Sequence, residues 1–177
     1  MKYLVMCEGA NELEIIRMLL ENDKLIFSEN DLLGLVPYHA RQIVNSPTVK
    51  TVLNSYQGDV HVLRIGDKLN DKLKIPLEYK EKIKKVAKYC TKPELEMLLI
   101  ISENLDGEFE KVKSKVSPKV FSKQNITYNR IRYNNKSEFY RIYYGHRIGF
   151  LVYTIKRYKR LKGKHGKDEL YLADLVK

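Results

Sequence analysis

The stretch Leu4-Val5-Met6-Cys7-Glu8-Gly9-Ala10-Asn11-Glu12 decides the fold of this 177-residue chain. Its first four residues are a short apolar run typical of a buried strand, and residues 13–20 place apolar side chains at helical spacing. Between strand and helix lie a glutamate, a glycine that we expect to allow a sharp turn, and a second glutamate. A carboxylate at the carboxyl end of a parallel strand points into the crevice where α/β sheets bind ligands. The order therefore predicts an α/β fold with candidate functional residues at Glu8 and Glu12.

The remaining residues up to about 105 predict further strands and helices around this first unit. Residues 60–65 alternate and are β-branched, which predicts a strand ending at Gly66-Asp67. Residues 32–38 predict a weaker strand because Pro37 cannot donate to a central ladder. His39 and Arg41 follow it and are expected to line the crevice. We expect helices at 11–22, 48–56, 78–90 and 94–101, with 78–90 on the surface and 94–101 buried because it is apolar on nearly all sides.

Residues 4–12 resemble the first motif of the Toprim fold, which topoisomerases, bacterial primases and several small nucleases share. A Toprim domain carries a second acidic motif about one βα unit later, usually Asp-x-Asp after a strand. Here Asp67 stands at that place, Leu69 replaces the second aspartate, and Asp71 follows two residues later. The resemblance thus implies a mostly parallel sheet flanked by helices, with Asp67 as a ligand and Asp71 as a displaced substitute.

A third match lies in Lys92-Pro93-Glu94-Leu95-Glu96-Met97-Leu98-Leu99, which resembles the Pro-x-x-Glu motif of small Toprim proteins of the RloB and abortive-infection type. Glu96 is the glutamate that aligns. Proteins of that type act in bacterial phage defence, commonly beside an ABC-type ATPase. The resemblance covers roughly residues 1–105 and implies a metal-dependent nuclease that acts as a toxic effector, with such an ATPase as a partner.

Carboxylates suit Mg²⁺ or Mn²⁺ rather than zinc, and two such ions can clamp the attacking and leaving oxygens of a phosphodiester. The predicted metal ligands are Glu8, Glu12, Asp67, Asp71 and Glu96, of which Glu8, Asp67 and Glu96 are also the predicted catalytic acids. Cleavage also needs a positive group near the leaving oxygen, for which Lys68, Lys72 and Lys119 are candidates. The plainer interpretations are a solvated turn, a polar loop after a strand, and a buried ion pair at Glu96.

Charge divides the chain unevenly. Residues 111–177 hold 18 Lys and Arg against 4 Asp and Glu, a balance of +14, so the net charge of +11 leaves −3 for residues 1–110. We therefore predict a Toprim-like α/β domain at 1–110 and a basic, mainly helical extension at 111–177, with helices near 107–115, 136–144, 147–160 and 170–176. An acidic part joined to a basic part indicates a polyanionic partner.

The basic extension interleaves arginines with tyrosines, which favours RNA or DNA as that partner. Cationic side chains neutralise phosphates, and tyrosines stack on unpaired bases. The predicted nucleic-acid-binding residues are Arg130, Arg132, Tyr133, Arg141, Arg147, Arg157, Arg160, Lys162 and Lys164. We expect about half of the tyrosines to belong to a core instead, because aromatic residues at helical spacing are mostly buried.

Two cysteines, Cys7 and Cys90, are too few for a disulfide framework, and no stretch is long and apolar enough for a membrane span. The sequence therefore predicts a cytoplasmic protein without a membrane partner. Two alternatives to the nuclease stay open. One is a non-catalytic nucleic-acid-binding module with a degraded metal site. The other is a metal-independent ribonuclease of the HEPN type, whose Arg-x4-6-His spacing Arg141 and His146 match.

Overall fold

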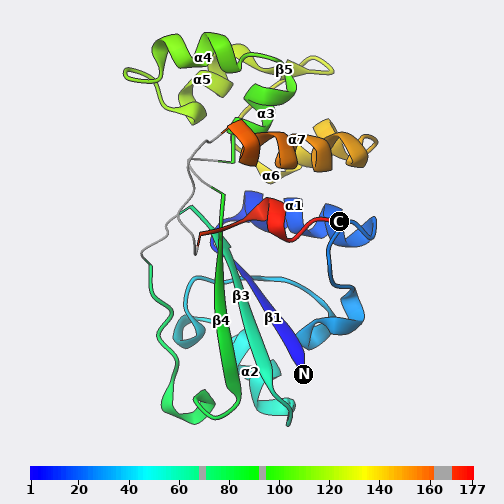
Figure 1. The fold of residues 1–177 in the computed structure, drawn as a ribbon, viewed down its shortest axis with the longest axis vertical. Coiled ribbons are helices and arrows are strands. Elements are labelled where there is room, and N and C mark those ends of the chain that lie inside the picture. Colours follow the sequence, from blue (N-terminus) through cyan, green and yellow to red (C-terminus); the bar gives the residue numbers. More distant parts are fainter. Residues whose placement is uncertain (68–70, 92–94, 162–168) are drawn as a thin grey trace.

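A five-stranded parallel sheet forms the lower half of the molecule in Figure 1. The computed structural model describes residues 1–67, 71–91, 95–161 and 169–177. The strands are β1 (Lys2–Cys7), β2 (Tyr38–His39), β3 (Val60–Gly66), β4 (Ile83–Cys90) and β7 (Leu170–Tyr171), in the order β2-β1-β3-β4-β7. Every neighbouring pair is parallel. The predicted α/β class is confirmed, and the arrangement is consistent with a Toprim-like fold.

Helices α3 to α7 gather above the sheet in Figure 1, while α2 lies beside its lower part. The helices are α1 (Ala10–Glu21), α2 (Pro47–Ser55), α3 (Met97–Ser102), α4 (Asp106–Val112), α5 (Pro118–Asn125), α6 (Ser137–Tyr144) and α7 (Ile148–Leu161). Short 3-10 turns occupy Glu29–Asp31, Leu33–Leu35, Ile43–Asn45, Leu77–Tyr79 and Leu172–Asp174. An antiparallel hairpin of β5 (Thr127–Tyr128) and β6 (Ile131–Arg132) links α5 to α6.

The two faces of β1 enter two hydrophobic cores because successive side chains of a strand point in opposite directions. Val5 and Cys7 pack in a large core with α1, α3 and α7, whereas Leu4 and Met6 pack in a smaller core with α2. Both cysteines are buried and unpaired with each other. The residue after Cys7, Glu8, therefore projects from the α2 side at the carboxyl edge of the sheet.

The predicted surface helix at 78–90 is wrong. Residues 77–79 form a 3-10 turn and residues 83–90 form β4, which pairs with β3 along its whole length. Alternating Lys and Glu suggested helical charge pairs, but pairing with a distant strand overrides such local preferences. Ile83 and Ala87 are buried while Lys84, Lys85 and Val86 are exposed. Cys90 consequently ends a strand rather than a helix.

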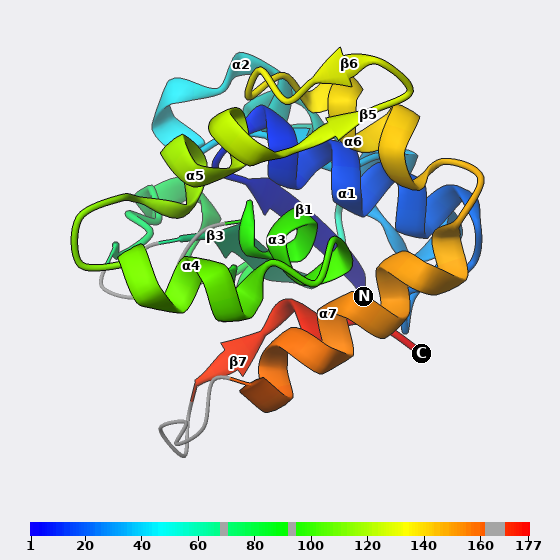
Figure 2. The ribbon, with the colours of Figure 1, turned by 90° about the horizontal axis from the view of Figure 1, so that it is seen from above.

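The predicted last helix at 170–176 is also replaced. Leu170 and Tyr171 form β7 beside β4, and only Leu172–Asp174 form a 3-10 turn. The basic extension thus supplies an edge strand of the sheet. Its helices pack in the same large core as α1, and Figure 2 shows α7 and β7 lying beside each other.

Four tyrosines of the extension are core residues, as the helical spacing predicted. Tyr133, Tyr140, Tyr143 and Tyr144 are each at most 2% exposed. Their rings meet edge to face, and the Tyr144 hydroxyl lies 2.8 Å from that of Ser102 on α3. These contacts tie α6 to the helices above the sheet. In the described part of the chain, no helix has the length and apolar character needed to cross a membrane.

Candidate metal and nucleic-acid site

Three predicted acids line one cavity at the carboxyl edge of the sheet. The cavity has a volume of about 430 Å³, and we call it the acidic cavity. Glu12 comes from the first turn of α1, Asp67 directly follows β3, and Glu96 directly precedes α3. The rest of the lining is Gly9, Ala10, Asn11, Leu95, Ser117, Lys119 and Asn135. The fold thus brings together three residues that are up to 84 positions apart in sequence.

Gly9 is needed for space rather than for the sharp turn that the sequence suggested. Its φ of −130° is one that any residue adopts. A Cβ at this position, however, would lie 2.3 Å from an oxygen of the Glu12 carboxylate. Only glycine lets that carboxylate lie against the backbone at the start of α1.

The environment of Glu12 favours its protonated form. Burial raises the pKa of Glu12 most, and the negative charges of Asp67, Glu96 and Glu8 raise it further, while a hydrogen bond with its own backbone opposes them. A carboxyl group whose pKa is raised by burial and by neighbouring acids in a cleft is typical of sites that bind cations or transfer protons. Glu12 is such a group in the acidic cavity.

Glu96 is 6% exposed and is held by a tyrosine rather than by the ion pair that the plainer interpretation expected. The Tyr133 hydroxyl donates to Glu96 Oε1 at 2.8 Å. With the Asn135 amide turned so that its oxygen faces Lys119, its nitrogen donates to Glu96 Oε1 at 3.2 Å and its oxygen accepts from Lys119 Nζ at 2.9 Å. Asn135 therefore links the buried acid to a lysine at the cavity.

Tyr133 is consequently misassigned in the predicted nucleic-acid-binding set. Its ring is 2% exposed and packs edge to face against Phe139 and Tyr140. A ring enclosed in this way offers no free face to a base. Its hydroxyl is instead engaged with Glu96.

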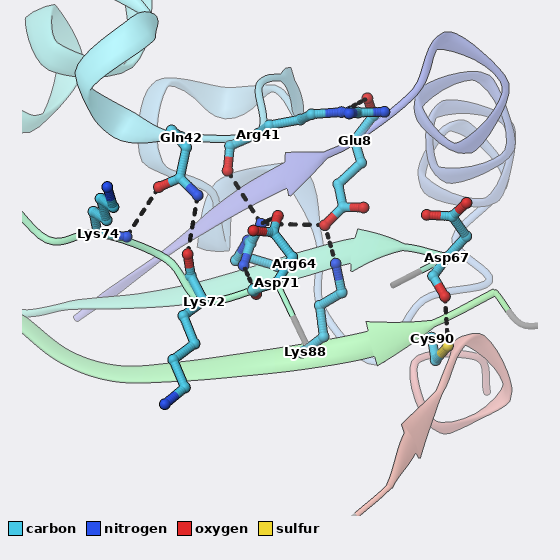
Figure 3. A network of polar contacts seen from close by, with 10 residues as sticks. All are labelled: Glu8, Arg41, Gln42, Arg64, Asp67, Asp71, Lys72, Lys74, Lys88 and Cys90. Carbon is cyan, nitrogen blue, oxygen red and sulfur yellow. Dashed lines mark hydrogen bonds and ion pairs between the residues drawn. The ribbon is translucent and has the colours of Figure 1, made fainter. Parts of the chain in front are cut away.

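Glu8 lies outside the acidic cavity and takes part in a separate ion-pair network with Arg64, Asp71 and Lys88. Figure 3 shows their side chains converging near the ends of β1, β3 and β4. Arg64 Nη2 lies 3.1 Å from Glu8 Oε1 and 2.7 Å from Asp71 Oδ2, and Lys88 Nζ contacts Glu8 Oε1. The hydrogen bond from Arg64 lowers the pKa of Asp71. The two predicted metal ligands Glu8 and Asp71 are thus neutralised by cations of the chain itself.

Arg64 and Lys88 are the functional residues that the sequence analysis missed. Arg64 is only 2% exposed, and its place in the apolar strand 60–65 was the available indication that it needs a buried partner. Lys88 was not predicted because residues 78–90 were expected to form a helix, and only a strand beside β3 brings Lys88 to Glu8. Gly66 completes the arrangement, because a Cβ there would lie 2.2 Å from the Glu8 carboxyl carbon.

The three lysines that are candidates for the positive group near the leaving oxygen differ in position. Lys119 lines the acidic cavity. Lys72 is exposed, and its carbonyl accepts from Gln42 at 3.0 Å, outside that cavity. Lys68 lies outside the described residues.

The predicted nucleic-acid-binding arginines fall into two groups. Arg141 pairs with Glu14 and Glu21 on α1, Arg147 stacks on the rings of Tyr128 and Tyr143, and Arg157 lies 3.8 Å from Asp106. These three are engaged within the protein. Arg132 is exposed but also engaged, because its Nε donates to the Lys123 carbonyl at 2.7 Å and its Nη2 to the Gln124 carbonyl at 3.0 Å. Arg130 and Arg160 are exposed, while Lys162 and Lys164 lie outside the described residues.

The HEPN-type alternative requires an all-helical fold, which the parallel sheet does not provide. Arg141, one half of its motif, is also occupied by two glutamates of α1. His146 is exposed in the turn between α6 and α7. The arrangement thus gives this alternative no support.

Carboxylate oxygens around a polar cavity are the donor type that Mg²⁺ and Mn²⁺ prefer. Among residues 1–67, 71–91, 95–161 and 169–177, however, no three His, Cys, Asp or Glu side chains form a group that could hold a metal ion. Glu12, Asp67 and Glu96 therefore fit such an ion by chemistry, but their side chains are not drawn together around one point.

Comparisons with models of known protein families, with curated proteins and with solved structures found no match to the chain. We therefore infer function from the chemistry of the acidic cavity and from the motif resemblance of residues 4–12.

Proposed function

We propose that the protein is a metal-dependent nuclease that hydrolyses phosphodiesters of RNA, such as tRNA, or of DNA. The observation that carries this proposal is the acidic cavity, in which Glu12, Asp67 and Glu96 surround one space at the carboxyl edge of a parallel sheet. This edge is where open α/β sheets bind ligands. The raised pKa of Glu12 supports it, because a bound cation would relieve the repulsion among the acids.

Each residue of the acidic cavity has a role in this proposal. Glu12, Asp67 and Glu96 would hold Mg²⁺ or Mn²⁺, which would supply a Lewis acid and a water nucleophile at neutral pH. Tyr133 fixes the orientation of Glu96 through its hydroxyl. Lys119, at the wall of the cavity, supplies positive charge to the phosphate oxygens.

Glu8 serves as a positioning residue in this scheme. Its buried ion pairs with Arg64 and Lys88 fix the end of β1, from which Gly9 and Glu12 follow. A role as a toxic effector in phage defence beside an ABC-type ATPase extends the proposal and is supported by the motif resemblance alone.

Thermal unfolding in the presence of Mn²⁺ tests the metal site without a known substrate. A ligand at 100 times its dissociation constant adds about 2.7 kcal/mol to the free energy of unfolding. For a chain of this size, that raises Tm by roughly 5–10 °C. We expect that shift in the wild type and its loss in Glu12→Gln/Asp67→Asn. Glu138→Gln, an exposed glutamate on α6, is the matched control and should keep it.

Cleavage of labelled tRNA and of single-stranded DNA with Mn²⁺ then tests the activity. The wild type should cleave one of them, and Glu12→Gln/Asp67→Asn should not. A wild type that shows neither a shift with Mn²⁺ nor cleavage would overturn the nuclease. These substitutions are preferred to Glu8→Ala, which would leave Arg64 and Lys88 without their buried partner.

A second candidate function, a non-catalytic nucleic-acid-binding module, is favoured by one observation. Two of the five predicted metal ligands, Glu8 and Asp71, are paired with Arg64 instead of facing the acidic cavity. Retained oligonucleotide binding by a protein that neither binds Mn²⁺ nor cleaves would establish this module.

A further inference from the structure

A second cavity lies on the other side of the β1–α1 connection. Its volume is about 290 Å³, and its lining includes Glu8, His39, Arg41, Gln42, Asn45 and Ser46. Glu8 lines this cavity while its neighbour Gly9 lines the acidic one, so the two cavities are separated by a single turn of backbone. We call it the Arg41 cavity.

Arg41 is the second residue after β2, and Glu8 is the first residue after β1. The parallel register pairs Cys7 with His39, and the Ala40 amide donates to the Cys7 carbonyl at 3.0 Å. Arg41 and Glu8 therefore leave the sheet at the same edge. This places a cationic side chain beside the turn that carries the acidic residues.

Arg41 makes two contacts of its own, and its neighbour Gln42 makes two more. Its Nε donates to the Glu8 carbonyl at 3.4 Å, and its own carbonyl accepts from Arg64 Nη2 at 3.2 Å. The next residue, Gln42, donates to the Lys72 carbonyl at 3.0 Å and accepts from the Lys74 amide at 2.9 Å. Figure 3 shows both residues anchored along this loop.

The terminal nitrogens of Arg41 make no hydrogen bond or ion pair with any residue in the described part of the chain. This sets Arg41 apart from Arg141, Arg147 and Arg157, each of which is engaged within the protein. A guanidinium held by Nε with both terminal groups free presents the fork that binds phosphate oxygens in pairs.

Glu8 is the acid among the described residues that line the Arg41 cavity, and it does not oppose an anion. Glu8 is paired with both Arg64 and Lys88, so two positive charges lie beside its single negative charge. The other polar residues of the lining, His39, Gln42, Asn45 and Ser46, are neutral or cationic. The cavity therefore combines an oriented cation with hydrogen-bonding groups.

We propose that the Arg41 cavity binds a phosphate of the nucleic acid that flanks the phosphate cleaved in the acidic cavity. The inference rests on the proposed function for its ligand class, but it is separable from the chemistry of cleavage. A strand that crosses the Glu8–Gly9 turn has one phosphate beside Arg41 and another beside Glu12, Asp67 and Glu96.

Binding of a short fluorescein-labelled single-stranded RNA, measured by fluorescence anisotropy in EDTA, tests the site without metal. Arg41→Gln should weaken binding roughly tenfold, as expected for the loss of one charged hydrogen-bonded contact. It should also lower the slope of log K against log salt by about 0.7, the contribution of one phosphate. Lys80→Gln, the same charge change at an exposed residue before β4, is the control and should leave both values unchanged.

A scan with single neutral methylphosphonates locates the contact. The wild type should lose affinity at one linkage, and Arg41→Gln should lose nothing further there. The Arg41 site is overturned if Arg41→Gln and Lys80→Gln have the same affinity and salt dependence. It is also overturned if the wild type and Arg41→Gln show the same methylphosphonate profile. In either case the nuclease proposal stands. Normal binding and an intact Arg41 effect, with neither a Mn²⁺-dependent shift in Tm nor Mn²⁺-dependent cleavage, would overturn the nuclease and leave the phosphate site.

Discussion

Replacing Arg64 with methionine tests whether the ion-pair network holds the carboxyl edge of the sheet together. The Glu8 side chain is 5% exposed and that of Arg64 is 2% exposed, so neither charge can turn to water. Breaking a buried ion pair by removing one partner costs about 3–5 kcal/mol. Lys88 remains beside Glu8, and the Asp71 side chain, 35% exposed, can be rehydrated. We therefore expect a loss near the lower limit, about 3 kcal/mol.

Urea unfolding followed by circular dichroism measures this loss directly. For a chain of this size it corresponds to a fall in Tm of about 6–12 °C. The matched control is Arg17→Met, because Arg17 is exposed on α1, and its effect should stay within about 0.5 kcal/mol.

The double variant Glu8→Gln/Arg64→Met makes the test stricter. Removing both charges leaves no unpaired buried carboxylate, and Lys88, 15% exposed, can reach solvent. The double variant should therefore be more stable than the sum of the two single losses predicts. Simple additivity, or a loss below about 1 kcal/mol for Arg64→Met, would refute the coupling of Glu8 and Arg64.

Three further predictions concern the two sides of this edge. The pKa of Glu12 is raised in the folded protein, so ionisation of Glu12 destabilises the fold. The stability that protonated Glu12 contributes is complete below its unfolded pKa of about 4.3, and it is lost as the pH rises through its folded pKa. Glu12→Gln should therefore raise Tm at pH 7, with the gain vanishing near about pH 4. Gly66→Ala should cost about 1–3 kcal/mol because its Cβ meets a buried carboxylate, whereas Gly107→Ala, with nothing within 4 Å, should be neutral or stabilising. Tyr133→Phe should cost about 1.5–3 kcal/mol by removing the hydroxyl that donates to Glu96.

The same unfolding measurements can contradict each of these. An unchanged or lower Tm for Glu12→Gln at pH 7 would mean that the acids do not repel one another. A stable Gly66→Ala would mean that the Glu8 carboxylate moves aside freely. A neutral Tyr133→Phe would mean that Glu96 finds an equivalent donor.

The sequence predicted those parts of the fold whose signals are local. The apolar run before Glu8 and the β-branched run 60–65 predicted β1 and β3. The weaker strand predicted at 32–38 is largely wrong, because Leu33–Leu35 form a 3-10 turn and β2 holds only Tyr38–His39. Its place at the edge of the sheet agrees with the argument from Pro37 against a central strand. β4 was missed because its Lys-rich outer face resembles a surface helix. Only its pairing with β3 makes it a strand, and that pairing is not written in residues 83–90 themselves.

The sequence predicted which acids lie at the acidic cavity better than it predicted how the side chains are arranged there. Glu12, Asp67 and Glu96 do meet in one cavity, as acids after strands and before helices should. That Glu8 turns to the opposite side follows from the alternation of β1 and from cations on two other strands. The sequence around Lys88 does not indicate its partner, whereas the place of Arg64 in an apolar strand indicates burial but not which residue it pairs with.

The short strand β7 has a consequence for how the chain is made. It pairs with β4, about 80 residues earlier, and the Ile26 amide donates to the Leu175 carbonyl, about 150 residues later. A ribosome that has synthesised β1 to β4 therefore carries a sheet whose outer edge is open. Contacts at such sequence separation form slowly, and open edges invite pairing with other chains. At that stage Tyr89 and Cys90, the two residues of β4 that pair with β7, have no strand beside them on that side.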